Sequence, residues 1–547
     1  PNSTLYGSEA VAGVINIITK DPKEQPIAAV DLMTTSHKEV FGNISVSPKV
    51  GKFNTMTGIN YAYVNHFDDD NNDGFSDIPG LDRFSLFSKW DMDRESGKRF
   101  TISGKFYYED RRNGVEEYLQ DRAYKDIRGH EEIYGESIYT NRLELFGTYE
   151  FNTGENIRLD YSFSYHDQDS YYGGDHYVAE QKIGFTNLVW TKQEGKHSLL
   201  GGLTMRYNGY DDNTVATQLE NGQNNADRQF IPGIFLQDEW KVSPKFTAMA
   251  GGRLDYYETH SLVFSPRLNL KYKLGEWTTV RSNFGTGFRM VNLFTEDHAF
   301  ISGNRSIEIV EDLDPESSYN VSLNLNHVYL LGKSEGMIDI DAYYTYFTNA
   351  IFPNYDDPTK IIYENINGHA VTKGIGLNLN QQFGRKLSAN LGINFQEVTE
   401  TTINDNGTEE VQDIPFAASW SGVATVNYNL PEHHWSFAYT VNATGPMALP
   451  EVYDLGPDGQ PLPDPRPTVS QPFAVHNLQI NKEVPKWNTR FYAGLQNIFN
   501  LQQDWSPLTG FNDPNAPTGF SEFFDTSYAY APIHGREIYV GFRLRIK

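Results

Sequence analysis

The sequence predicts an all-β protein that folds as a closed, 22-stranded antiparallel transmembrane β-barrel. Apolar residues recur at every second position in many segments, as expected when one face of a strand is apolar and the other is polar. No run approaches the roughly 18 consecutive apolar residues that a transmembrane helix requires. The connections between candidate strands alternate between short and long, which is typical of bacterial outer-membrane barrels.

The two-residue period is clearest at the C-terminus. Apolar and largely polar positions alternate there, with Ile538, Val540, Phe542, Leu544 and Ile546 set against Glu537, Tyr539, Gly541, Arg543 and Arg545. We therefore expect the apolar set to face lipid, and Tyr539, Arg543 and Arg545 to face the lumen.

The composition agrees with a barrel. The chain of 547 residues is 39% hydrophobic and 14% aromatic, with 34 Tyr and 34 Phe. Tyrosine suits a strand whose side chains meet both lipid and headgroups. The mean hydropathy of −0.54 does not separate a barrel from a soluble protein, because only alternate residues of a barrel strand face lipid.

The candidate strands number 22, which allows antiparallel closure without an unpaired edge in lipid. They fall near residues 27–36, 39–49, 52–65, 82–94, 99–112, 138–152, 156–169, 176–192, 197–210, 229–243, 246–259, 263–274, 277–290, 316–331, 335–348, 368–383, 386–399, 416–430, 433–446, 472–484, 487–499 and 535–547. The short connections hold two to four residues each, such as those at 50–51, 95–98, 194–195 and 384–385. The long ones are polar and cover 66–81, 113–137, 211–228, 291–315, 349–367, 400–415, 447–471 and 500–534.

Other features exclude classes of function. The absence of Cys removes thiol catalysis and Cys-ligated metal sites, and the net charge of −26 argues against a nucleic-acid partner. The sequence has no nucleophile elbow, no His-Glu-x-x-His pair and no phosphate-binding loop. We therefore expect a protein that is not an enzyme and requires no cofactor.

Residues 6–20 carry two glycines, Gly7 and Gly13, followed by the apolar run Val14-Ile15-Asn16-Ile17-Ile18. This segment resembles the end of the plug domain in TonB-dependent receptors. Further segments resemble motifs of the same family, namely residues 232–240, Gly287-Phe288-Arg289, residues 314–320, residues 494–500 and Gly535-Arg536. The Tyr-rich loops resemble those of receptors from Bacteroidetes.

The resemblance implies that residues 1–25 are the C-terminal end of a plug domain, that 6–20 form a buried strand in the lumen, and that 26–547 form the barrel. It also implies a location in the outer membrane and active import of a scarce, bulky nutrient. An iron chelate or a corrinoid is the expected ligand, with haem uptake as a further reading. The expected partners are outer-membrane lipid, TonB and a surface lipoprotein. Because the chain begins Pro1-Asn2-Ser3, we expect the rest of the plug and the TonB box to lie upstream.

The acidic run at 68–77 is a candidate calcium site. Oxygen ligands stand at Asp69, Asn71, Asp73 and Asp77, and Gly74 occupies the sharp bend, as in the first nine positions of a calcium loop. The usual Glu at the twelfth position is missing, since Gly80 stands there. A solvated acidic turn is the alternative.

Candidate ligand-binding residues lie in the long loops. His298 falls between two of the family motifs, where haem receptors carry an iron-ligating His. The loop tyrosines, whose rings suit a ligand with flat or apolar parts, are Tyr118, Tyr124, Tyr134, Tyr171, Tyr172, Tyr210 and Tyr355. Ordinary loop packing is the alternative for each of them.

Two other functions remain open from the sequence. A passive diffusion porin would be smaller, with about 16–18 strands, and would have no plug. A surface binding protein anchored by the barrel would also need no plug.

Overall fold

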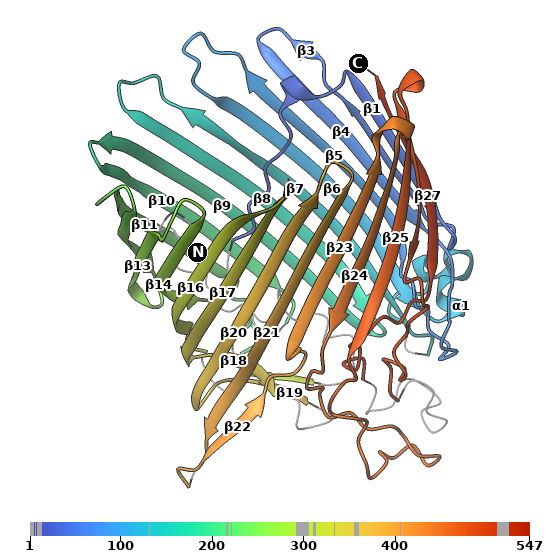
Figure 1. Cartoon of the computed structure of the whole chain (residues 1–547). Helices are drawn as coiled ribbons and strands as arrows, with labels where there is room; N and C mark the ends of the chain where they lie inside the picture. The colour runs from blue at the N-terminus through green and yellow to red at the C-terminus, as the bar shows by residue number, and fades with distance from the viewer. Residues whose placement is uncertain are drawn as a thin grey trace.

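The barrel is closed by pairing between the first and last strands of the wall (Figure 1). A computed structural model describes residues 5, 7, 14–130, 132–214, 217–219, 221–290, 306–309, 313–332, 334–354, 360–404, 406–510 and 525–546. One sheet of 24 strand segments forms the wall, and two of these segments, β3 and β22, continue the wall strands β2 and β23 across short irregularities. The predicted closed barrel of 22 antiparallel strands is therefore confirmed.

The strand bounds follow the predicted ranges closely. The first half comprises β1 (Ala28–Thr35), β2 (Val40–Val46), β3 (Lys49–Val50), β4 (Phe53–Val64), β5 (Gly80–Met92), β6 (Phe100–Gly114), β7 (Gly135–Glu150), β8 (Asn156–Tyr172), β9 (Asp175–Glu194), β10 (His197–Asp212), β11 (Asp227–Trp240) and β12 (Phe246–Tyr257). The second half comprises β13 (Ser261–Lys273), β14 (Thr278–Arg289), β16 (Glu316–Leu331), β17 (Ser334–Asn349), β20 (Gly368–Phe383), β21 (Leu387–Ile403), β22 (Glu409–Asp413), β23 (Trp420–Leu430), β24 (Trp435–Thr444), β25 (Phe473–Val484), β26 (Thr489–Gln496) and β27 (Glu537–Ile546).

The long connections contain structure that the sequence did not predict. A helical turn, α1 (Glu116–Leu119) with η3 (Gln120–Lys125), follows β6. A small sheet of β15 (Ser306–Ile309), β18 (Ile351–Asn354) and β19 (Lys360–Asn365) joins two different loops. The predicted strand at 416–430 begins only at Trp420, because a turn with Phe416 at a φ of 62° interrupts the wall.

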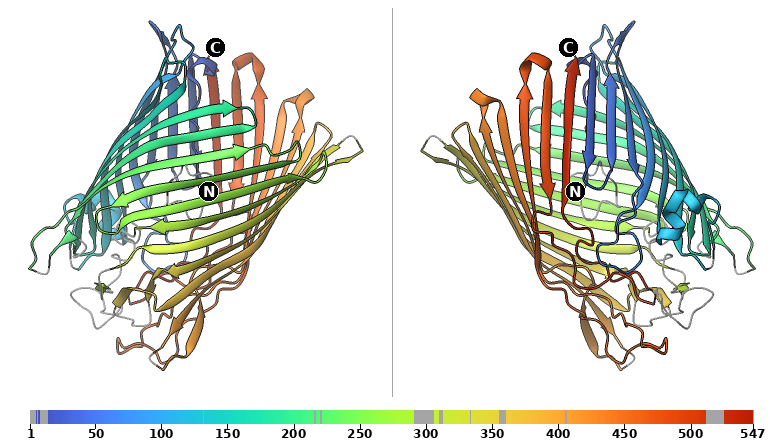
Figure 2. Two further views of the ribbon diagram at one scale, coloured as in Figure 1. Left: turned by 90° about the vertical axis from the view of Figure 1, so that its left-hand side faces the viewer. Right: turned by 90° about the vertical axis from the view of Figure 1, so that its right-hand side faces the viewer.

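The two rims of the barrel differ in the way that the connections predicted. Short turns gather at the upper rim in Figure 1 and long loops at the lower one, and the strands are tilted between them (Figures 1 and 2). Gly195 lies in one of the short turns at a φ of 58°, a backbone conformation that residues other than glycine rarely adopt. Pro431–His433 and Pro485–Trp487 form 3-10 turns, η6 and η7, at the same rim.

An apolar surface covers the outside of the wall. Exposed apolar side chains stand opposite one another on neighbouring strands, for example Phe106 with Leu143 and Phe284 with Val321. Five of the exposed tryptophans lie at or beside the short turns, namely Trp90, Trp240, Trp277, Trp435 and Trp487, whereas Trp505 lies in the last long loop. Such a belt is expected at a membrane interface. No described helix is long and apolar enough to cross a bilayer.

The opposite face of the strands is polar and lines the lumen. In β12, Arg253 donates to Asp255 at 2.7 Å and to Thr204 at 2.8 Å, and all three side chains are buried. In β27, Arg543 Nε donates to Asp31 Oδ2 at 2.7 Å, and Tyr539 donates to Gln479 at 2.8 Å. These contacts agree with the predicted luminal orientation of Tyr539 and Arg543.

The N-terminal segment lies inside the barrel (Figure 1). Lys89 on β5 donates to the Thr19 hydroxyl at 2.9 Å and to the Lys20 carbonyl at 3.1 Å. Residues 14–20 form no strand, and Ile15 is 91% exposed, so the prediction of a buried strand is wrong for these residues. The physical reason is that no described strand pairs its backbone with theirs; the contact with β5 is made by the Lys89 side chain alone. The assignment of residues 1–25 to a plug domain stays a prediction.

Candidate functional site

Three predicted tyrosines support the base of the loop after β6. Tyr118 and Tyr124 are 0% exposed and Tyr134 is 3% exposed. The Tyr124 hydroxyl donates to Asp110 Oδ2 at 2.8 Å, and the Tyr134 ring packs 5.7 Å from that of Phe75. Burial raises the pKa of all three hydroxyls, which keeps them protonated. A ligand could touch these rings only if the loop moved.

Buried Arg112 holds this loop to the wall and was missed by the sequence reasoning. Its guanidinium contacts Asp82 Oδ2 at 3.0 Å, Asn65 Oδ1 at 3.1 Å and the Val64 carbonyl at 3.3 Å. The same group lies 5.0 Å from the centre of the Tyr124 ring. One cation therefore fixes the ends of β4, β5 and β6 and the helical turn after them.

A second tyrosine cluster packs at the extracellular ends of β8, β9 and β10. The hydroxyls of Tyr210 and the unpredicted Tyr177 lie 2.8 Å apart, and Tyr210 donates to Asp212 at 2.7 Å. Tyr172 packs in the same buried cluster. Tyr172 and Tyr210 therefore pack against the wall and do not form part of an open surface.

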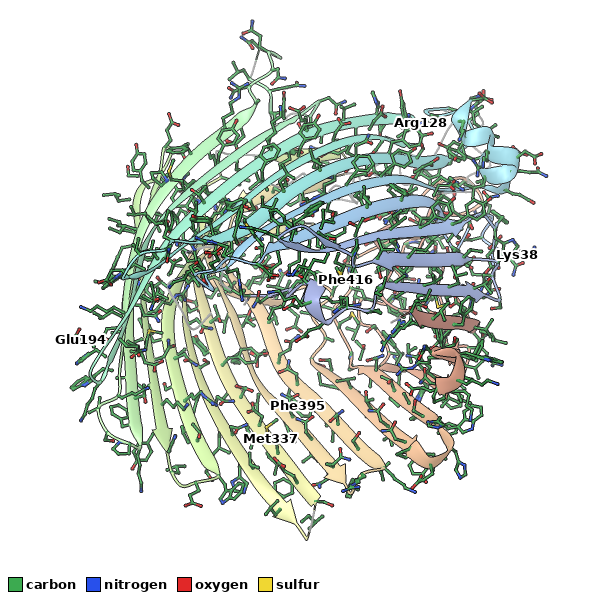
Figure 3. The ribbon with its side chains drawn as sticks, turned by 90° about the horizontal axis from the view of Figure 1, so that it is seen from above. Lys38, Arg128, Glu194, Met337, Phe395 and Phe416 are labelled. Atoms are coloured by element: carbon green, nitrogen blue, oxygen red, sulfur yellow. The ribbon has the colours of Figure 1, made fainter. Side chains whose placement is uncertain are left out.

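Tyr171 is the most accessible of the predicted tyrosines that the structure describes. It stacks on His176 with ring centres 4.3 Å apart, and Arg128 lies 4.8 Å from its ring. Arg128 also donates to Asp169 Oδ1 at 2.7 Å, and Figure 3 places it at the rim beside the helical turn. The ring of Tyr171 is half-buried, so one part of it faces solvent at the mouth.

His298 and Tyr355 lie outside the described residues. The motifs that flank His298 are described: Arg289 at the end of β14 donates to Glu316 at the start of β16, at 2.6 Å. Glu316 Oε1 also accepts the Ile351 amide at 3.2 Å, which ties the next loop to the same point. These family motifs therefore join the ends of two long loops, the one between β14 and β16 and the one that follows β17.

The acidic run has the internal bonding of an ordered loop. Asp69 accepts from the amides of Asp73 and Gly74, each at 3.0 Å, and Gly74 has a φ of 88°. Asn71 accepts from the Asp73 amide at 2.9 Å, and Asp77 accepts from the Asp70 amide at 2.7 Å. Within the described residues, the carboxylates of Asp69, Asp73 and Asp77 are not gathered within 4.8 Å of one another.

Asp77 is the most perturbed carboxyl of this loop. It is 8% exposed, and burial raises its pKa to about 7. The neighbouring carboxylates of Asp73, Asp69 and Asp70 add to this rise, whereas the hydrogen bond from the Asp70 amide opposes it. Repulsion among these groups is what a cation would relieve.

A charged hollow on the luminal face of β6, β7 and β8 was also missed. Arg142 Nε donates to Glu144 at 2.6 Å, and Lys105 Nζ lies 3.5 Å from the other oxygen of that carboxylate. Arg111 and His166 line the extracellular half of the same hollow. The sequence carried a signal for this hollow, because Lys105, Glu109 and Arg111 occupy alternate positions of β6, on the face opposite Phe106 and Tyr108.

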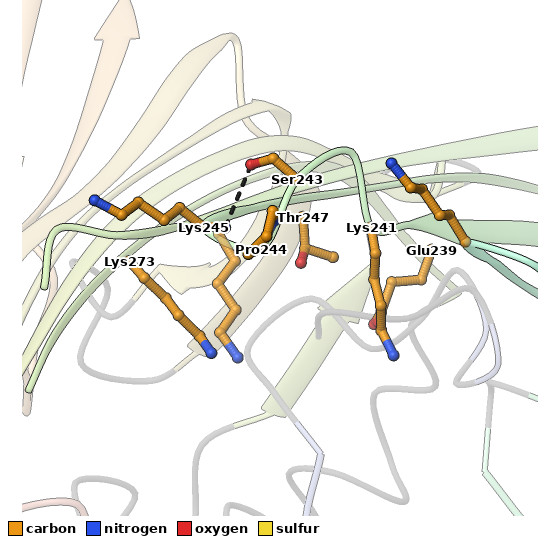
Figure 4. Close-up of a pocket in the computed structure, with 9 residues that line it drawn as sticks. Glu239, Lys241, Ser243, Pro244, Lys245, Thr247 and Lys273 are labelled. Atoms are coloured by element: carbon orange, nitrogen blue, oxygen red, sulfur yellow. Dashed lines mark hydrogen bonds between the residues drawn. The ribbon is translucent and has the colours of Figure 1, made fainter. Parts of the chain in front are cut away.

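Two further hollows lie deeper in the lumen. Leu5 and Gly7 of the N-terminal segment line one of them together with wall residues of β8 to β12, including Asp160 and Arg206. The other lies near the short turns and is basic (Figure 4), being lined by Lys196, Lys241, Lys245, Lys271 and Lys273. The luminal face is thus rich in charges of both signs, although the chain carries a net charge of −26.

Comparison with known proteins decides the family. The model of the TonB-dependent receptor-like β-barrel matches residues 47–498 of this chain. The chain belongs to this family. It is therefore an outer-membrane β-barrel of the TonB-dependent receptor type, as the motifs predicted.

Curated relatives of this family member are distant and longer. An iron-regulated outer membrane virulence protein of Vibrio cholerae is 26% identical over 59% of this chain and 49% of its own length. The ferric enterobactin receptor PirA of Pseudomonas aeruginosa is 23% identical over 64% of this chain and 54% of its own length. The vitamin B12 transporter BtuB of Vibrio vulnificus is 23% identical over 58% of this chain and 50% of its own length. The chain spans about half the length of these relatives.

Solved structures share the fold. The siderophore receptor PirA of P. aeruginosa gives a TM-score of 0.66 at 14% identity, covering 100% of this chain and 85% of that one. The ferric-catecholate import receptor Fiu of E. coli gives 0.70 at 14% identity, with the same coverage. At this identity the likeness supports the barrel architecture alone.

Proposed function

We propose that this chain is the barrel of a TonB-dependent transporter that imports a bulky iron chelate. The observation that carries the proposal is the N-terminal segment inside the lumen, held by Lys89. A passive porin or an anchored surface binder would need no such segment. Two of the named relatives are described by iron regulation or ferric enterobactin, which supports an iron chelate as ligand.

The charged hollow between β6 and β8 is where we place recognition of the chelate. A chelate that carries anionic oxygens would meet Lys105, Arg111 and Arg142 there before it reached deeper parts of the lumen. Exposed fractions of 37% for Lys105 and 39% for Arg142 leave both cations accessible. Charge-assisted hydrogen bonds of this kind contribute more than neutral ones.

Uptake experiments test the transport proposal. Cells that make the full-length protein should accumulate iron from a labelled ferric chelate, and a protonophore should abolish this uptake. In planar bilayers the same protein should show no steady conductance. Steady conductance, or uptake that is insensitive to the protonophore, would support the porin instead.

A pair of matched variants tests the hollow. Arg142→Glu should weaken chelate binding at least tenfold, whereas Arg158→Glu should leave it unchanged. Arg158 is a fair control because it forms a similar luminal pair, with Asp160 at 2.9 Å, but lies near the short turns at 40% exposure. Equal losses in both variants would show that luminal charge in general, and not this hollow, controls binding.

A corrinoid is the second candidate ligand, favoured by the similarity to a vitamin B12 transporter. Accumulation of labelled cyanocobalamin by the same cells separates it from the iron chelate. Haem is the third candidate and depends on His298. Loss of haem binding in His298→Ala, with the iron chelate still bound, would support it. TonB and a surface lipoprotein remain proposed partners.

We also propose that the loop from Asp69 to Asp77 binds calcium weakly. The turn at Gly74 and the oxygen atoms of Asp69, Asn71, Asp73 and Asp77 support the proposal. Because these carboxylates are spread apart, the loop would have to contract around the ion. Such a rearrangement lowers affinity.

A further inference from the structure

Closure of the barrel brings together three segments that are far apart in the sequence. We call the line where β1 pairs with β27 the seam. At its extracellular end lie His37 in the turn after β1, Asp68 at the start of the first long loop, and His534 just before β27. Lys38, next to His37, marks this place at the rim in Figure 3.

The ligand atoms of these side chains face one another. His37 Nε2 lies 3.5 Å from Asp68 Oδ2, and His534 Nδ1 lies 3.8 Å from the same oxygen. The two imidazole rings are 4.4 Å apart and nearly perpendicular, at 79°. One ligand atom of each residue lies within 4.8 Å of the others, and this is the one such group within the described part of the chain.

These separations are close to those of a zinc site. With Zn–N and Zn–O distances of about 2.0–2.1 Å in tetrahedral geometry, neighbouring ligand atoms are about 3.3 Å apart. The two separations from Asp68 Oδ2 exceed this value by 0.5 Å or less, and the separation between the two ring nitrogens is at most 4.8 Å, so the rings would close on the ion by a small side-chain movement. Two imidazoles and a carboxylate also suit zinc better than calcium, which prefers oxygen ligands alone.

The cluster leaves buried polar atoms without hydrogen-bond partners. Asp68 Oδ2 and both ring nitrogens of His534 are buried and accept or donate no hydrogen bond. Such groups destabilise the folded state unless a hydrogen bond or an ion satisfies them. A bound cation would satisfy the oxygen and one of the nitrogens at once.

A further carboxylate stands behind the two rings. Glu537 Oε2 lies 3.9 Å from His37 Nδ1 and 3.9 Å from His534 Nε2. Metal-bound histidines usually donate their second ring nitrogen to a carboxylate or carbonyl, which orients the ring. Glu537 is placed to accept these protons after a shift of about 1 Å, given hydrogen-bond lengths near 2.9 Å.

The backbone around the cluster is held in place independently of a metal. The Asp68 carbonyl accepts the Asp77 amide at 2.6 Å, and Asn497 Nδ2 donates to the His534 carbonyl at 3.4 Å. The Cβ of a residue larger than Gly535 would lie 2.8 Å from Asp70 Oδ2, so the first and last long loops approach closely here. The ligands thus start close to a binding arrangement.

We propose that His37, Asp68 and His534 bind one divalent transition-metal ion, with Zn²⁺ the best match, and that this ion fastens the extracellular end of the seam. A solvent molecule would complete the tetrahedron. The ion would link the β1–β2 turn, the first long loop and the last long loop. This role is structural and is independent of which ligand the barrel imports.

Zinc titration of the full chain without a histidine tag tests the proposal. After treatment with a chelator, the protein should bind one equivalent of Zn²⁺ more tightly than its other histidines do, and Co²⁺ at that site should show tetrahedral visible absorption. His534→Gln and Asp68→Asn should each weaken this site at least tenfold. His260→Gln, which changes a half-buried histidine at a different turn, should not.

Two controls keep the result decisive. Saturating calcium should leave the tight zinc site intact, because the calcium loop uses other carboxylates. Circular dichroism should show the same β-sheet content in Asp68→Asn, the mildest change, as in the unaltered protein. Retention of the tight equivalent in folded Asp68→Asn and in folded His37→Gln/His534→Gln would overturn the proposal, as would absence of tight binding in the unaltered protein.

Discussion

Replacement of Phe542 by arginine is the sharpest test of how the wall sits in the membrane. Phe542 is the sixth of the ten residues of β27 and stands opposite Leu32 of β1 and Phe491 of β26. Leu32 and Phe491 are 40% and 42% exposed on the outer face. An arginine at this depth should cost about 2–4 kcal/mol. The lost contact with the Phe491 ring, 6.4 Å away, should add about 0.5–1.5 kcal/mol.

The neighbouring residue provides the matched control. Arg543 faces the lumen and pairs with Asp31, and its side chain is 43% exposed, so Arg543→Ala should cost no more than about 1 kcal/mol. Denaturant unfolding of the protein in lipid vesicles, followed by tryptophan fluorescence, gives both values. Equal costs for the two variants would mean that the strand faces the other way or does not cross the bilayer.

Three further outcomes are expected. Calorimetry should detect one weak calcium site that Asp69→Ala with Asp73→Ala removes. Its affinity should fall as the pH drops from 8 to 6, because protonation of Asp77, whose pKa is raised to about 7, competes with the ion; a pH-independent affinity would contradict this. In calcium-free buffer the folded loop is favoured while Asp77 is protonated, because the pKa of this acid is higher in the folded loop than in an unfolded chain. Resistance of residues 66–79 to proteolysis should therefore decrease as the pH rises from about 4 to 7. An increase in resistance over this range would refute the raised pKa of Asp77. Arg112→Ala leaves Asp82 and the backbone of Val64 without their buried partner, so it should lower the free energy of unfolding by about 3–5 kcal/mol. Arg112→Lys should not restore this stability, because lysine lacks the planar guanidinium. A decrease below about 1 kcal/mol would show that the contacts of Arg112 contribute little to stability.

The wall was predictable because its pattern is local. Alternation in a segment such as 537–546 depends on which side of one strand meets lipid, and this can be read without knowing its neighbours. The short turns at Gly195 and its equivalents are equally local, since the backbone conformation selects the residue. The number of strands, their order and the two kinds of rim followed from these signals together.

The errors concern features that depend on distant partners. Residues 14–20 are apolar enough for a strand, but a strand also needs a neighbour, and none of the described ones pairs with them. The role of Tyr124 and Tyr210 in ligand binding stays a prediction, but the sequence alone did not indicate that both side chains are buried. Their burial depends on Asp110 and Tyr177, which stand elsewhere in the sequence.

The cluster at the seam could be predicted in part, because it depends on residues that are distant in the sequence but that the fold brings together. His37 and His534 are nearly the length of the chain apart, so no local pattern connects them. Closure of a barrel requires the first and last strands to pair, however, and the turn after the first must then meet the segment before the last. The juxtaposition of the two histidines was therefore implied by the predicted fold, although Asp68 was not.

The shortness of the seam has a consequence for the surrounding lipid. Eight residue pairs join β1 to β27, whereas sixteen join β9 to β10. Eight residues at about 3.3 Å each, tilted by about 40°, rise only about 20 Å, which is less than the roughly 25 Å apolar band of such barrels. Acyl chains beside the seam must shorten their span to match, whereas those beside β9 need not. The bilayer around the protein should therefore differ in thickness from one side of the barrel to the other. The surrounding lipid should be thinnest and most disordered where β1 meets β27.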